Sequence, residues 1–237
     1  MIRGVLGSRG GVGGVLGSGR GGAAAAWYLA GGVSAANCVA AYQAKGAASL
    51  AASYTNLANP GTYNAAPGVA PTFDTATGWT FNGSSQYLTT GVVPDATAQA
   101  WSMFIRFSNA SGATNNYIAG CSDTVPNPDL VFFLISRPAA STVFFANGAN
   151  TASYSSSATS GVLGFAGVTG YLNGSSVATI AAGGAANTRP SSIFMGANSF
   201  NASALAFFNG KIQAVAIYNV TLNAATVAAI SAAMAAL

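Results

Sequence analysis

The sequence predicts an all-β protein: a two-sheet jelly-roll sandwich with a short C-terminal helix and an extended glycine-rich N-terminal arm. Short runs of alternating or wholly apolar residues predict about a dozen strands, and Gly and Asn fill the gaps between them. Helical periodicity is found only at the end of the chain. Because one core accounts for the whole pattern, we expect an arm and linker in residues 1–35 and a single domain in residues 36–237.

The arm contains the near-repeat GVLGSRGG and GVLGSGRGG between Gly4 and Gly22. Glycine loses more backbone freedom on folding than other residues, so this stretch needs contacts from outside itself to become ordered. Its own domain could offer a groove. A neighbouring chain is favoured, because the small apolar pairs alternate with glycines that let backbones approach closely. The candidate anchoring residues are Arg3, Val5, Leu6, Arg9, Val15, Leu16 and Arg20.

Charge is scarce: 5% of the 237 residues are charged, against about 25% in a typical domain. Such a surface suits contact with other protein, so we expect a homo-oligomer. The net charge of +4 is concentrated in the arm, through Arg3, Arg9 and Arg20, and the remainder is nearly neutral. No specific nucleic-acid binding is therefore expected. No apolar run reaches the roughly 20 residues of a membrane span, so no membrane association is expected either.

The strands are expected in the following order. GWTFNGSSQYLTTG, residues 78–91, contains two short runs joined by turn residues. WSMFIRF, residues 101–107, alternates with period 2, which places Trp101, Met103, Ile105 and Phe107 on one face. LVFFLIS at 130–136 and TVFFAN at 142–147 are apolar on both faces, which is typical of strands between layers.

The C-terminal third supplies further elements. Asn173-Gly174 predicts a hairpin turn, and SIFMG at 192–196 and KIQAVAIYN at 211–219 predict strands. Asn223 can cap a final helix, whose apolar stripe is Val227, Ile230, Met234 and Leu237. The two cysteines, Cys38 and Cys121, are too few for a disulfide framework. They could pair, but buried free thiols are the favoured interpretation.

Four motifs occur in an order that resembles the concanavalin A-like lectin/glucanase (laminin-G-like) jelly-roll superfamily. They are F-x-G-x-x-x-Y-L from Phe81, the Trp-Ser start of a strand at Trp101, Y-x-N-G from Tyr171, and F-x-G-x-I-x-x-V-x-I-Y-N from Phe208. The resemblance covers roughly residues 38–237 and implies the fold rather than one function. The charge-poor style, rich in Ala, Gly, Ser and Asn, resembles virion proteins of tailed phages.

Two functions follow as expectations. The leading one is a non-enzymatic structural protein of a phage virion, either a capsid decoration or a tail or fibre component, which the arm anchors to other virion proteins. The alternative is a secreted or surface carbohydrate-binding lectin module, hence an extracellular protein. Host surface glycans are a candidate partner under both readings.

Missing residue types narrow the chemistry. The chain has no His, which excludes a Ser-His-Asp triad and a His-based metal site. It has no Glu, so a glycosidase would need two of Asp74, Asp95, Asp123 and Asp129. No pair of these is placed for acid–base work, and Asp74 and Asp95 are in turn contexts. We expect no catalytic residues and no organic cofactor.

Two weaker site candidates remain. SDTVPNPD brings Asp123, Asn127 and Asp129 within seven residues, and their oxygens are ligands that Ca²⁺ accepts. A plain loop is the favoured alternative, because Asp, Asn and Pro are ordinary turn residues. Tyr117, in ATNNYIAG, is the candidate aromatic residue for glycan binding.

Overall fold

A computed structural model describes residue 1 and residues 26–94, 98–112, 114, 116–123, 130–183 and 191–237. The described residues form two sheets of eight and nine short strands, which confirms the predicted two-sheet β-sandwich with a short C-terminal helix. The seventeen strands exceed the dozen expected, partly because several span only two or three residues. The arm and its seven candidate anchoring residues lie outside this description.

The eight-stranded sheet, sheet A, runs in the order β13-β12-β11-β6-β17-β4-β3, and β1 also pairs with β17. Its pairings are antiparallel. In chain order its strands are β1 (Cys38–Gln43), β3 (Thr72–Asp74), β4 (Gly78–Asn82), β6 (Ser102–Ser111), β11 (Gly161–Ala166), β12 (Thr169–Leu172), β13 (Ser175–Thr179) and β17 (Asn209–Tyr218).

The nine-stranded sheet, sheet B, runs in the order β10-β9-β8-β7-β14-β5-β2. β15 pairs with β16 and, in parallel, with the same edge of β7 that β14 uses. Its strands are β2 (Ala66–Val69), β5 (Tyr87–Thr89), β7 (Tyr117–Asp123), β8 (Leu130–Arg137), β9 (Thr142–Gly148), β10 (Thr151–Ser155), β14 (Phe194–Met195), β15 (Asn198–Phe200) and β16 (Ser203–Leu205).

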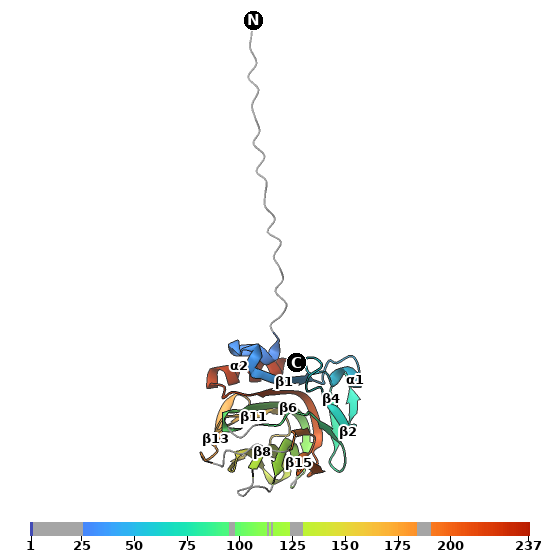
Figure 1. Ribbon diagram of the computed structural model, residues 1–237, viewed down its shortest axis with the longest axis vertical. Coiled ribbons are helices and arrows are strands. Elements are labelled where there is room, and N and C mark those ends of the chain that lie inside the picture. Colours follow the sequence, from blue (N-terminus) through green and yellow to red (C-terminus); the bar gives the residue numbers. More distant parts are fainter. Residues whose placement is uncertain (2–25, 95–97, 113, 115, 124–129, 184–190) are drawn as a thin grey trace.

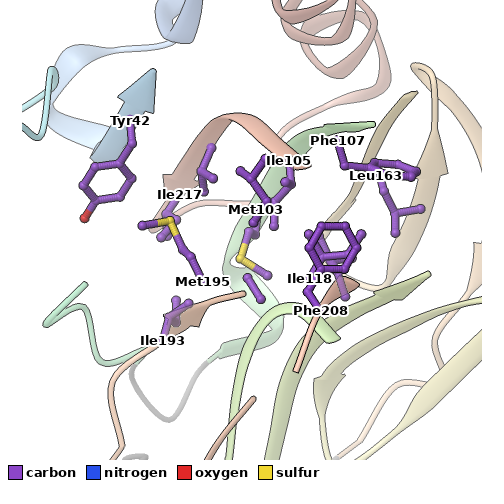
Figure 2. Close-up of a cluster of buried hydrophobic side chains, with 14 of the residues drawn as sticks. Tyr42, Met103, Ile105, Phe107, Ile118, Leu163, Ile193, Met195, Phe208 and Ile217 are labelled. Carbon is purple, nitrogen blue, oxygen red and sulfur yellow. The ribbon is translucent and has the colours of Figure 1, made fainter. Parts of the chain in front are cut away.

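The main core lies between the two sheets, as Figure 2 shows. Met103 and Ile105 of β6 and Ile217 of β17 meet Met195 of β14 across this space. The inward side chains of β6 therefore follow the predicted alternation. Phe104, which lies between Met103 and Ile105 in the sequence, points to the opposite face of sheet A. Burial of such side chains is worth about 1.5–3 kcal/mol each.

A helical layer covers the outer face of sheet A (Figure 1). α2 (Ala224–Ala236) and the 3-10 helix η1 (Trp27–Gly32) pack together there over Phe104 and Tyr218. The predicted stripe of α2 is confirmed, with Val227, Ile230 and Met234 fully buried. The packed part of the chain thus includes residues 27–33, which precede the expected start of the domain.

Other helical turns are short. They are η2 (Ala35–Asn37), α1 (Leu50–Ser53), η3 (Ala98–Ala100) and η4 (Pro138–Ala140). These turns were not predicted, because helices of three or four residues are too short to show helical periodicity. Within the described parts of the chain, no helix has the length and apolarity needed to cross a membrane.

Turn chemistry agrees with the prediction at Asn173-Gly174, which joins β12 to β13 with positive φ at both residues, 51° and 81°. The two short runs predicted within residues 78–91 do not lie in one sheet: β4 belongs to sheet A and β5 to sheet B. Both cysteines are buried and neither is in a disulfide, in agreement with the prediction: Cys38 is in the core beneath the helices and Cys121 is in the core between the sheets. Burial raises the pKa of the Cys38 thiol to about 12.

The helix cap gives a stability prediction. The Asn223 side chain accepts a hydrogen bond from the backbone N–H of Thr226 at 2.9 Å, and Asn223 itself is exposed. Asn223→Ala removes this acceptor and should lower the free energy of unfolding by about 1 kcal/mol in urea titration. Asn223→Asp keeps an acceptor and should stay near the wild-type value. Equal loss in both variants would contradict this role.

Candidate functional site

A cavity of about 560 Å³ opens on the outer face of sheet B, away from the helical layer. Strands β7, β8, β15 and β16 supply its lining. Its apolar wall consists of Tyr117, Val131, Phe133, Phe200, Leu205 and Ala206, and its polar floor consists of Ser122, Asp123 and Asn198. An apolar concavity with a few convergent polar groups is the usual form of a small-ligand site.

The apolar wall is preformed by aromatic packing. The rings of Tyr117 and Phe133 meet edge to face, with centroids 4.9 Å apart. Gly120 pairs with Phe133 across β7 and β8, and a Cβ on Gly120 would lie 2.3 Å from the Phe133 Cβ. Only glycine at position 120 therefore lets the Phe133 side chain lie over β7, which fixes the wall beside Tyr117.

The outer apolar row continues from this wall along β8 and β9. Phe133, Ile135 and Ala146 are buried there, with Phe144 packed against them. The runs around 130–136 and 142–147 are thus apolar on both faces as predicted, although their outer face borders a cavity. At the far end of β8, the Arg137 guanidinium carbon lies 4.7 Å from the centre of the Phe144 ring.

The tyrosine hydroxyl in the wall stays protonated at neutral pH. Burial raises the pKa of Tyr117, and the positive charge of Arg137 opposes that shift only in part. A protonated phenol can donate a hydrogen bond to a ligand as well as accept one. Tyr117 thus offers both a ring face and a polar tip.

The polar floor is held by hydrogen bonds between distant parts of the sequence. Ser191 Oγ donates to Asp123 Oδ1 at 2.7 Å and accepts from the Ala202 N–H at 2.8 Å. Asn198 Nδ2 donates to Ser122 Oγ at 2.7 Å. The parallel pairing of β15 with β7 brings these residues together.

Two acceptors of the floor are left unpaired. Asp123 and Asn198 are only 2% and 6% exposed, and among the described residues neither Asp123 Oδ2 nor Asn198 Oδ1 has a hydrogen-bond partner. Buried polar atoms are nearly always satisfied, and an unmade hydrogen bond costs about 1–3 kcal/mol. Both side chains line the cavity, and these two oxygens are themselves almost fully buried, so the floor has unsatisfied acceptors directly beneath its surface.

The structure brings two of the predicted site residues together, Tyr117 in the wall and Asp123 on the floor. Asn127 and Asp129, the other proposed calcium ligands, are outside the described residues, so this set stays a prediction. In the part of the chain that is described, no group of three or more His, Cys, Asp or Glu could hold a metal ion. Sequence reasoning missed Ser122, Ser191 and Asn198, because ordinary polar residues separated by about 70 positions carry no shared signal.

The two aspartates in the described residues, Asp74 and Asp123, do not form a pair suited to acid–base catalysis. Asp74 ends β3 of sheet A, where its carboxylate caps a turn through the N–H groups of Ala76 and Thr77. Asp123 ends β7 of sheet B. Glycosidases hold two carboxyl groups about 5–9.5 Å apart across one sugar, and these two acids lie in separate sheets. Asp95 and Asp129 lie beyond the described parts of the chain.

Comparison with known proteins shows the fold. No family model matches the sequence, and no curated protein matches it significantly. A mutant Trypanosoma rangeli sialidase with trans-sialidase activity superposes with a TM-score of 0.54 at 15% identity, over 85% of this chain and 34% of its own. The same sialidase in complex with sialic acid gives 0.52 at 14% identity, over 82% and 32%.

The binding domain of botulinum neurotoxin DC, in complex with SialylT, superposes with a TM-score of 0.56 at 11% identity. The match covers 84% of this chain and 52% of that chain. This chain therefore spans about a third to a half of the length of these structures. At such identity the likeness establishes the all-β sandwich fold and nothing about ligands.

The floor gives a second stability prediction. Ser191→Ala removes the donor to Asp123 and the acceptor for Ala202 N–H at once, leaving buried groups unpaired. The free energy of unfolding should fall by about 2–3 kcal/mol in chemical denaturation. In an Asp123→Ala background the same change should cost clearly less, because the carboxylate is no longer there. Additive losses in the double variant would show that the two side chains do not interact.

Proposed function

We propose that this protein is a non-catalytic carbohydrate-binding module whose site is the cavity on the outer face of sheet B. The observation that carries the proposal is the combination of an aromatic wall with unpaired acceptors on the floor. A pyranose ring has an apolar C–H face and a rim of hydroxyl donors. The face can pack on Tyr117 and Phe133 while the hydroxyls approach Asp123 and Asn198.

The structural neighbours support this reading in general terms. Two of them are complexes with sialic acid or with SialylT. They favour the lectin alternative over the virion role, for which neither the neighbours nor the described residues offer support. The virion interpretation depends on the arm, residues 1–22, and remains an expectation from the sequence.

The non-catalytic part of the proposal rests on the carboxylates. Asp123 lines the cavity without a second described acid beside it, since Asp74 is in the other sheet. Acid–base cleavage of a glycosidic bond needs two such groups. The protein should therefore hold a glycan and release it unchanged.

A glycan array probed with the full chain tests the proposal directly, with Ca²⁺ and with EDTA in parallel. Binding to a defined set of glycans is expected, without release of reducing sugar from any of them. The EDTA arm reports on the predicted calcium ligands Asp123, Asn127 and Asp129. No binding to any glycan would contradict the proposed function.

Tyr117 gives the sharpest variant of this site. Tyr117→Ala removes the ring against which the sugar packs and should weaken binding of the best array glycan about tenfold, measured by isothermal titration calorimetry. Tyr154→Ala is the matched control, because Tyr154 is exposed on β10 and does not line the cavity. Similar effects of both variants would place the glycan elsewhere.

A further inference from the structure

We infer that the cavity selects uncharged sugars and rejects carboxylated ones, including sialic acid, and that Asp123 sets this selection. The inference rests on the proposed function and names the substrate class of the same site. A preference for uncharged sugars would distinguish this chain from the two structural neighbours that are complexes with sialic acid or with SialylT.

The hydrogen-bonding pattern of the floor is the first argument. Ser191 Oγ directs its proton to Asp123 Oδ1, and Asn198 Nδ2 is used by Ser122 Oγ. The atoms left over, Asp123 Oδ2 and Asn198 Oδ1, are both acceptors. A ligand that satisfies them must bring donors. Sugar hydroxyls are donors, whereas a carboxylate is an acceptor only.

Charge is the second argument. Asp123 is the only charged residue among the described residues that line the cavity, and it is 2% exposed. The carboxylate acts on a ligand even without touching it, because poor solvation weakens screening. At about 6 Å and an effective dielectric of about 20, repulsion between two carboxylates corresponds to about a hundredfold in affinity.

Arg137, the cation described on this face of sheet B, lies at the far end of β8 from Asp123. Asp123 pairs with Leu130 at one end of β8, and Arg137 is at the other end. At about 3.3 Å per residue, the seven steps from Leu130 to Arg137 span about 23 Å. Arg137 is moreover stacked on Phe144. Its charge acts on Tyr117 at the other end of the cavity, whereas a sugar beside Asp123 does not contact it.

Matched pairs of ligands test the inference. Methyl glucoside is compared with methyl glucuronide, methyl galactoside with methyl galacturonide, and lactose with 3′-sialyllactose, in low and high salt. The best neutral array glycan is compared with its carboxylated counterpart in the same way. The neutral member of each binding pair should bind at least thirtyfold more tightly at low salt, and the ratio should shrink at high salt.

Asp123→Asn removes the charge but keeps the shape. The ratio of affinities within each pair should fall below about fivefold. Binding of the neutral sugar should also weaken about tenfold, because the charged hydrogen-bond acceptor is lost. Asp74→Asn makes the same charge change on sheet A, where Asn can still cap the turn. It should alter neither quantity. If Asp123→Asn does not fold, the wild-type ratios and their salt dependence decide the matter alone.

The outcomes separate the two proposals. Carboxylated sugars that bind as tightly as their neutral partners, or undiminished discrimination in folded Asp123→Asn, overturn this inference and leave carbohydrate binding intact. Absence of binding by every sugar tested overturns the proposed function together with the inference.

Discussion

The organisation of the molecule depends on the pairing of β17 with three other strands. One edge of β17 pairs with β6, and the other pairs with β4 and then β1. Its inward side chains, including Val215 and Ile217, enter the core between the sheets, and its outward ones, including Tyr218, lie beneath the helical layer. The Tyr218 hydroxyl also donates to the Tyr28 carbonyl at 2.8 Å, which ties η1 to sheet A. The central strands of sheet A are thereby buried on both faces.

The helical layer covers part of the outer face of sheet A, whereas the outer face of sheet B has no such layer among the described residues. α2 and η1 lie on sheet A (Figure 1). The cavity of about 560 Å³ is on the other side of the sandwich, on sheet B. There β7 meets both an antiparallel and a parallel partner, β14 and β15, along one edge. The parallel segment brings Asn198 beside Ser122, and Ser191 reaches Asp123. A polar floor is thus formed under an aromatic wall.

Periodicity and turn chemistry predicted much of the framework. Alternation in residues 101–107, the Asn173-Gly174 turn and the Asn223 cap are local signals, and the structure confirms each. β1 was not predicted, because CVAAYQ is buried almost throughout by α2, η1 and sheet B and shows no alternation. β14 lies within the strand predicted at residues 192–196, whereas β15 and β16 are too short to give a pattern of their own.

The site was predictable only in part. Tyr117 and Asp123 were identified as separate candidates for different ligands, and only folding places them in one cavity. Their partners Ser191 and Asn198 lie about 70 residues further along, and nothing in a single sequence links a serine or an asparagine to a distant aspartate. Gly120 also gave no signal, although its missing side chain makes room for Phe133.

A ¹H–¹⁵N NMR titration of the full chain with its best array glycan tests the central claim most directly. If the outer face of sheet B is the binding site, shifts should concentrate in Tyr117–Asp123, around Val131 and Phe133, and in Asn198–Ala206. The amides of α2 and of the β12–β13 hairpin should stay in place. Saturable shifts centred on α2, with none along β7 and β15, would contradict the account.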